Sequence, residues 1–163
     1  MGCLGGLRAI TKEELVKLRN VPRQDRVPDY LDEMVQEDSC ELDKAWDAIH
    51  RALTNGKLEF GHKNSPGCLV IFGGEVMRGN QPGEEDYIVV CKSPVQVRKA
   101  AQFLQGLTEE AFRKLYFAID PGEYEMEPDE DDFEYTWYYL KDSIPFWKNA
   151  AEKQLWVLFD VDQ

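Results

Sequence analysis

The residues best suited to chemistry gather around one of only two histidines. Asp43 and Asp47 precede His50 by seven and three residues, and Trp46 precedes it by four. On a helix with 3.6 residues per turn, these side chains can share one flank. Carboxylates beside an imidazole and an indole suit general acid–base catalysis or the binding of a small ligand, because histidine titrates near neutral pH. The alternative is a half-buried histidine that donates to a carbonyl while the tryptophan fills the core. A lone histidine beside an apolar stripe favours this alternative.

A helix over residues 42–56 would position this group. Its apolar stripe recurs at i, i+4, i+7 and i+11 and consists of Leu42, Trp46, Ile49 and Leu53. Asp38 and Glu41 are spaced as a capping box ahead of it. Arg51 stands four residues after Asp47, which predicts an ion pair on the solvated side. An Asn-Gly pair at residues 55–56 provides a left-handed stop.

A glycine turn is the second candidate site. Residues 68–72 are a continuous apolar run, which predicts a strand covered on both faces. Gly73, Gly74 and Glu75 follow it, where ligand-binding turns lie in layered sheets. The patterns GxGxxG and GxxxxGK[ST] are absent and residues 77–86 read as loop, so an anion site here is incomplete. The plainer interpretation is a tight turn that needs left-handed backbone angles.

Patterns for metals and activated nucleophiles are absent from the sequence. The four cysteines include no CxxC pair, and the histidines at positions 50 and 62 are too few for a zinc site built mainly on histidine. Residues 123–134 hold eight acids and no base. Phe133 stands where a calcium loop needs an oxygen ligand, so this run predicts a solvated acidic loop. We therefore assign no catalytic residue, no metal and no cofactor.

Composition limits the classes of partner. The chain has 163 residues, 43% of them hydrophobic, and a net charge of −12. This charge disfavours nucleic acid and anionic membranes, whose binding depends on lysine and arginine, and it permits a basic protein partner. We expect a cytoplasmic location, because no signal peptide or membrane-spanning run is evident and the cysteines within apolar runs suit a reducing compartment.

The order of elements predicts a layered α/β (α+β) domain over residues 1–163. Apolar runs predict strands near residues 3–10, 68–72, 87–91 and 155–159. Capping patterns predict helices that begin after Thr11, Ser93 and Thr108. Two further helices are expected over residues 28–37 and 133–151, the second kinked or divided at Pro145. About four strands separated by helices indicate a small mixed sheet with helices packed on it.

These pieces together resemble the YfbM-like family, a group of small, mostly bacterial proteins without an assigned function. The resemblance depends most on Leu42-Asp43-Lys44-Ala45-Trp46 with His50, and it extends to Leu4-Gly5 and to Gly73-Gly74-Glu75. It implies a layered cytosolic α/β domain and no reaction. A family site, if one exists, is expected at the matched positions Asp43, Trp46, His50, Gly74 and Glu75.

Two hypotheses on function follow. The first is a non-enzymatic interaction module for a basic partner, for example an acidic, immunity-type inhibitor that uses residues 123–134 in the contact. The second is a small-molecule binder or enzyme with a cleft beside Trp46, His50 and Glu75. The lack of a complete catalytic set in so acidic a chain favours the first. The oligomeric state is left open.

Overall fold

The structure is a computed structural model, and it describes residues 3–21, 27–33, 38–60, 65–124 and 126–163. Five strands form one sheet in the order β2-β1-β5-β4-β3. Their bounds are Leu4–Ile10 (β1), Ser39–Asp43 (β2), Glu75–Arg78 (β3), Tyr87–Lys92 (β4) and Trp156–Asp162 (β5). The expected α+β class is confirmed. The sheet has five strands instead of about four, and it is antiparallel instead of mixed, since its four strand pairs are all antiparallel.

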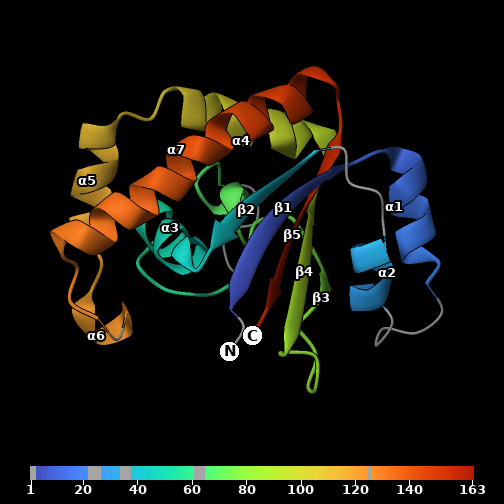
Figure 1. Cartoon of the computed structure of the whole chain (residues 1–163), viewed down its shortest axis with the longest axis horizontal. Coiled ribbons are helices and arrows are strands. Elements are labelled where there is room, and N and C mark those ends of the chain that lie inside the picture. Colours follow the sequence, from blue (N-terminus) through green and yellow to red (C-terminus); the bar gives the residue numbers. More distant parts are fainter. Residues whose placement is uncertain (1–2, 22–26, 34–37, 61–64, 125) are drawn as a thin grey trace.

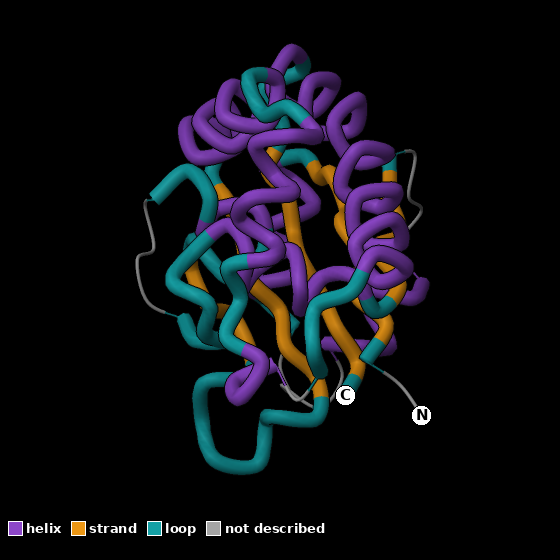
Figure 2. Tube along the Cα trace, turned by 90° about the vertical axis from the view of Figure 1, so that its left-hand side faces the viewer, coloured by secondary structure: helices purple, strands orange, loops and turns teal. Residues whose placement is uncertain are grey.

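Helices cover both faces of this sheet. Within the described residues the α-helices are Lys12–Arg19 (α1), Val27–Glu33 (α2), Ala45–Leu53 (α3), Pro94–Gln105 (α4), Glu109–Phe117 (α5), Pro121–Tyr124 (α6) and Glu130–Glu152 (α7). Figure 1 shows α3, α4, α5 and α7 on one side of the strands and α1 and α2 on the other. From the side of the larger helix layer, Figure 2 shows helices crossing in front of the sheet.

The sheet separates two apolar cores. Alternate residues of a strand point to opposite faces, so Leu7 and Phe159 enter the large core with α3, α4, α5 and α7. Ile10 and Leu158, which stand an odd number of residues from Leu7 and Phe159 on the same strands, enter a smaller core with α1 and α2. The central strand β5 is therefore buried on both sides, and it carries the continuous apolar run that predicted it.

Local capping rules predicted three helix starts correctly. The Thr11 side chain accepts a hydrogen bond from the Glu14 amide, and Glu14 reaches back to the Thr11 amide. Ser93 and Gln96 form the same reciprocal pair at the start of α4. Thr108 caps α5. Each side chain satisfies an amide that lacks a partner within its helix.

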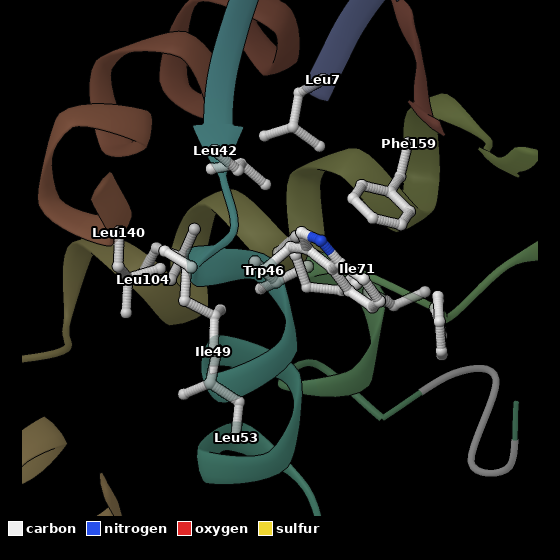
Figure 3. Packing of buried hydrophobic residues seen from close by; sticks show 14 of the residues in the cluster. Leu7, Leu42, Trp46, Ile49, Leu53, Ile71, Leu104, Leu140 and Phe159 are labelled. Carbon is white, nitrogen blue, oxygen red and sulfur yellow. The ribbon is translucent and has the colours of Figure 1, made fainter. Parts of the chain in front are cut away.

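The helix predicted over residues 42–56 begins later than expected. Residues 39–43 form β2, and α3 starts at Ala45, so the proposed capping box at Asp38 and Glu41 is wrong. Asp43 has a left-handed φ of 48°, which turns the chain between strand and helix. Leu42 still enters the same core as Trp46 and Ile49, as Figure 3 shows, which explains why it fitted the helical stripe.

The strand predicted at residues 68–72 is also wrong. Cys68–Val70 form a 3₁₀ turn, and the strand comes later, at Glu75–Arg78, where part of a loop was expected. The five side chains from 68 to 72 are at most 2% exposed. A buried turn and a buried strand both require an unbroken apolar run, so hydrophobicity alone does not distinguish them.

One further expectation fails in the C-terminal half, and one of the two alternatives expected at Pro145 is excluded. The acidic run is not a loop throughout, because residues 121–124 form α6 and Asp129 caps α7 with a 2.8 Å hydrogen bond from the Asp132 amide. The positive end of the α7 dipole stabilises the acidic side chains in its first turn. Pro145 lies inside α7 without dividing it. The expected end of the helix over 28–37 lies outside the described residues.

Among the described helices, none combines the length and the apolar character that a bilayer crossing requires.

Candidate binding cleft

The structure places two predicted site residues, Trp46 and His50, in the core. Trp46 is 3% exposed and His50 is 1% exposed. Both rings lie against Phe72, with centroid distances of 5.7 Å from Trp46 and 4.9 Å from His50. A Cβ on Gly5 would lie 2.7 Å from Cδ1 of Trp46, so β1 needs glycine where the indole packs against it. The indole Nε1 donates to the Cys3 carbonyl at 2.8 Å.

His50 has the environment of a structural residue. Its Nε2 lies 3.1 Å from the Glu59 carbonyl oxygen, and its Nδ1 has no hydrogen-bond partner among the described residues. Burial lowers the pKa of His50 to about 4, against a smaller opposing effect of the Glu59 hydrogen bond, and the nearby Lys92 charge lowers it further. The imidazole is therefore neutral at physiological pH.

The acids expected beside His50 have other partners. Asp47 forms the predicted ion pair with Arg51, with 2.5 Å between Oδ1 and Nε. Asp43 belongs to β2, and its Oδ2 accepts a 3.3 Å hydrogen bond from the Tyr139 hydroxyl. The polar group of Asp43, Asp47 and His50 expected on one helical flank is therefore not formed.

Gly74 immediately precedes β3, and Glu75 is the first residue of that strand. Gly74 has a φ of 115°, and a Cβ there would lie 2.3 Å from the Cys91 carbonyl oxygen, which agrees with the tight-turn interpretation. The Glu75 carboxylate pairs with Arg19 of α1 at 2.6 Å. Since α1 covers the opposite face from Trp46 and His50, the structure does not bring Glu75 into their group.

A fully buried cation, Lys92, was not predicted from the sequence. Lys92 is fully buried, and its Nζ donates to the carbonyls of Ile71 and Gly73 at 2.5 and 2.8 Å. Burial lowers the pKa of Lys92 to about 7. The available signal was its position at the end of β4, where it shares the inward face with Ile88 and Val90. Lys92 therefore holds the end of the 3₁₀ turn against the core by two hydrogen bonds, and its own side chain is buried beneath that turn.

A cleft of about 510 Å³ opens beside the outer edge of Trp46. It lies where the turn after β2, the start of α3, and helices α6 and α7 meet. Aromatic and acidic side chains form half of its described lining, and Leu58 and Met126 add apolar surface. The central residues are Trp46, Asp47, Tyr124, Asp132 and Tyr135, with Lys44 also in the lining.

Hydrogen bonds hold the acidic wall of the cleft in place. The hydroxyls of Tyr116 and Tyr124 both donate to Oδ2 of Asp132. Burial raises the pKa of Tyr124, and the charge and hydrogen bond of Asp132 add to the rise, so this phenol stays protonated. The Arg51 guanidinium lies 5.7 Å from the Tyr124 ring centroid while it pairs with Asp47.

The backbone amide of Lys44 completes the cleft by donating to the Tyr135 hydroxyl at 3.1 Å. The site is therefore a preformed, half-buried hollow whose described lining includes two carboxylates, three aromatic rings and no histidine. Among the described residues, no group of three or more His, Cys, Asp or Glu side chains is placed to hold a metal ion. This arrangement is suited to binding a cation.

Two other hollows lie near β2. One, of about 380 Å³, lies on the sheet beside β1 and β2, where Arg8 donates to both carboxylate oxygens of Asp160 at 2.8 and 3.1 Å. Tyr87 also donates to Asp160. The second, of about 420 Å³, lies between β2 and α7.

Comparisons with known proteins agree with the α+β fold. The crystal structure described as a protein of unknown function, YfbM from Escherichia coli, has a TM-score of 0.73, is 19% identical and covers 97% of this chain and 99% of its own. At that identity the likeness shows the fold alone. Residues 1–160 match the family described as "Domain of unknown function (DUF1877)", so the chain belongs to this family and the YfbM-like resemblance is confirmed. No curated protein matches the chain.

Proposed function

We propose that this protein is a non-catalytic binding module whose cleft receives a positively charged group, from a basic protein partner or a small cation. One observation carries the proposal: Asp47 and Asp132 line the same half-buried hollow as Trp46, Tyr124 and Tyr135.

Carboxylates and aromatic rings favour the same class of ligand. An ammonium or guanidinium over the face of a tyrosine or tryptophan gains about 0.5–2 kcal/mol, depending on how far it is desolvated. Asp132, which has no basic partner among the described residues, adds Coulomb attraction, which is stronger in a partly buried hollow than in bulk water. Asp47 adds less, because it already pairs with Arg51. The net charge of −12 extends the attraction over the surface and raises the rate of encounter with cations.

Acid–base catalysis at Trp46, His50 and Glu75 has less support. His50 is enclosed in the core, with Nε2 on a backbone carbonyl. A general base must come within hydrogen-bond reach of the proton it removes. Glu75 lies on the other side of the sheet, in an ion pair with Arg19.

The test is a titration with agmatine, which carries both an ammonium and a guanidinium group. We expect agmatine to shift the indole N–H resonance of Trp46 in ¹⁵N-correlated spectra, while the dianion glutarate does not. Asp132→Asn keeps an oxygen that accepts from both phenols but removes the charge, so agmatine affinity should fall about tenfold, or about 1.4 kcal/mol.

Glu109→Gln is the matched control. It removes one charge from the exposed first turn of α5, away from the cleft lining, and should leave agmatine affinity within about twofold of wild type. Equal losses in Asp132→Asn and Glu109→Gln would mean that net charge alone attracts agmatine. No shift of the Trp46 resonance at any agmatine concentration would overturn the proposal.

A further inference from the structure

We propose that the free edge of β2 and the adjoining groove along α7 bind an extended, basic segment of a partner protein as a sixth strand. This inference rests on the proposed function, because it extends the cation-binding cleft along the neighbouring surface. A sheet edge presents unpaired amides and carbonyls, and an extended peptide can add to them by main-chain hydrogen bonds.

The edge is accessible and bordered by a groove. β2 is the outermost strand next to β1, and Ser39 and Glu41 are exposed on it. The groove of about 420 Å³ runs between this strand and α7. Its lining combines strand residues with acidic and aromatic residues of the helix: Ser39, Cys40, Glu41, Tyr138, Tyr139, Asp142 and Phe146.

Aromatic rings connect this groove with the cleft. Tyr138 is 64% exposed and packs edge-on against Tyr139, with ring centroids 5.2 Å apart. Tyr139 in turn packs against Tyr135 of the cleft at 5.1 Å. Asp43, at the end of β2, accepts a hydrogen bond from Tyr139. A chain that follows β2 is therefore led along these tyrosines to the opening beside Trp46.

Charge selects a basic segment. No basic side chain in the described part of the chain forms an ion pair with Glu41 or Asp142, although both line the groove. Their fields meet at Cys40: burial raises the pKa of its thiol to about 11, and the charges of Asp142 and Glu41 add to the rise. Alternate side chains of an added strand point to opposite faces, so lysine or arginine can approach both carboxylates.

The same charges disfavour a second copy of this chain. Pairing of β2 with its own copy would bring the carboxylates of Glu41 from both molecules to the same edge, and opposed like charges are destabilising. The ladder between β1 and β2 also has a register shift between Gly5 and Gly6. Such bulges and edge charges are devices that prevent sheets from self-associating.

Hydrogen exchange with a designed peptide tests the inference. The probe is a short peptide in which pairs of lysines alternate with pairs of valines, so that lysines lie on both faces of the added strand. Its control carries N-methyl groups on alternate backbone nitrogens, which block main-chain pairing but keep the charge. We expect the unmodified peptide to slow exchange of amides within residues 39–43 and the methylated peptide to bind at least tenfold more weakly. The double variant Glu41→Gln/Asp142→Asn should bind the unmodified peptide about tenfold more weakly, since it removes both carboxylate charges of the groove.

The controls separate this inference from the proposed function. Glu109→Gln/Glu152→Gln removes two exposed acids elsewhere and should leave peptide affinity unchanged. Peptide binding without protection of residues 39–43, absence of peptide binding, or equal affinity for the methylated peptide would overturn the added strand. Protection that rises with protein concentration alone, with a dimer in sedimentation, would assign the edge to a second copy and also overturn it. Agmatine shifts at Trp46 report the cleft independently, so either proposal can fail alone.

Discussion

Two polar regions of this protein lie close to Trp46 and differ in what they can contact. In the interior, His50 and Lys92 are at most 1% exposed, and both face backbone carbonyls. In the cleft, Asp47 and Asp132 are reachable from solvent, and their partners are side chains. The strongly lowered pKa values belong to the interior pair. A perturbed pKa is therefore a sign of burial here, and accessibility decides which region can bind a ligand.

The largest effect should come from truncating the interior lysine. Lys92→Ala removes the donor to the Ile71 and Gly73 carbonyls and leaves a cavity, so we expect unfolding free energy to fall by about 2–5 kcal/mol. Chemical denaturation at neutral pH measures this loss. Lys92→Met fills the space without donating and should cost less, with unchanged agmatine affinity. A Lys92→Ala variant that is fully stable but no longer binds agmatine would contradict this, because the interior would then serve binding and not folding.

Acid should destabilise the fold through His50. Its pKa is about 4 in the folded protein and about 6.5 when unfolded, so the unfolded state binds the extra proton between these values. Stability is then fully present above pH 6.5 and falls as the pH drops to 4, by roughly 3 kcal/mol for this group. Denaturant midpoints of wild type and His50→Gln across this range measure the effect. The variant should lose less stability on acidification; parallel curves would show that His50 is solvated.

In the cleft, changes should act on binding more than on folding. Tyr135→Leu removes one aromatic face and the acceptor for the Lys44 amide. We expect agmatine affinity to fall about three- to tenfold, which corresponds to the 0.5–1.5 kcal/mol of an accessible cation–π contact. Calorimetric titration provides the affinity, and thermal unfolding checks the fold. Tyr138→Leu, on the exposed face outside the cleft, is the matched control and should bind agmatine normally.

The sequence predicted the features that depend on short-range rules. The caps at Thr11, Ser93 and Thr108 and the pair of Asp47 with Arg51 follow from spacing within one helical turn, and all four are confirmed. The 3₁₀ turn at residues 68–70 was not predicted, because a buried segment consists of apolar residues whether it is a turn or a strand. Lys92 was missed because its partners are carbonyls 19 and 21 residues away.

The cleft illustrates the same limit. Of its central residues, the sequence indicated only Trp46 and Asp47, because both belong to the helix that carries His50. Tyr124, Asp132 and Tyr135 come from the acidic and aromatic segment about 80 residues later, which was expected to be a solvated loop followed by a core helix. Long-range packing of α6 and α7 against α3 brings the two segments together, and no local pattern encodes that distance.

The smallest predicted effect is also the sharpest test of what the cleft prefers. Lys44 lines the cleft and is exposed, so its ammonium opposes the approach of another cation. Lys44→Gln keeps a side chain of similar length and leaves the backbone amide that donates to Tyr135. Relief of one screened repulsion is worth a few tenths of a kcal/mol, so agmatine affinity should rise about twofold, with little change in the unfolding temperature. Lys153→Gln, remote from the cleft, gives the same change in net charge. If Lys44→Gln instead weakens agmatine binding, the Lys44 ammonium does not oppose the ligand and agmatine does not bind beside it. If both variants strengthen binding equally, the attraction comes from the whole acidic surface and not from Asp47, Asp132 and the rings between them.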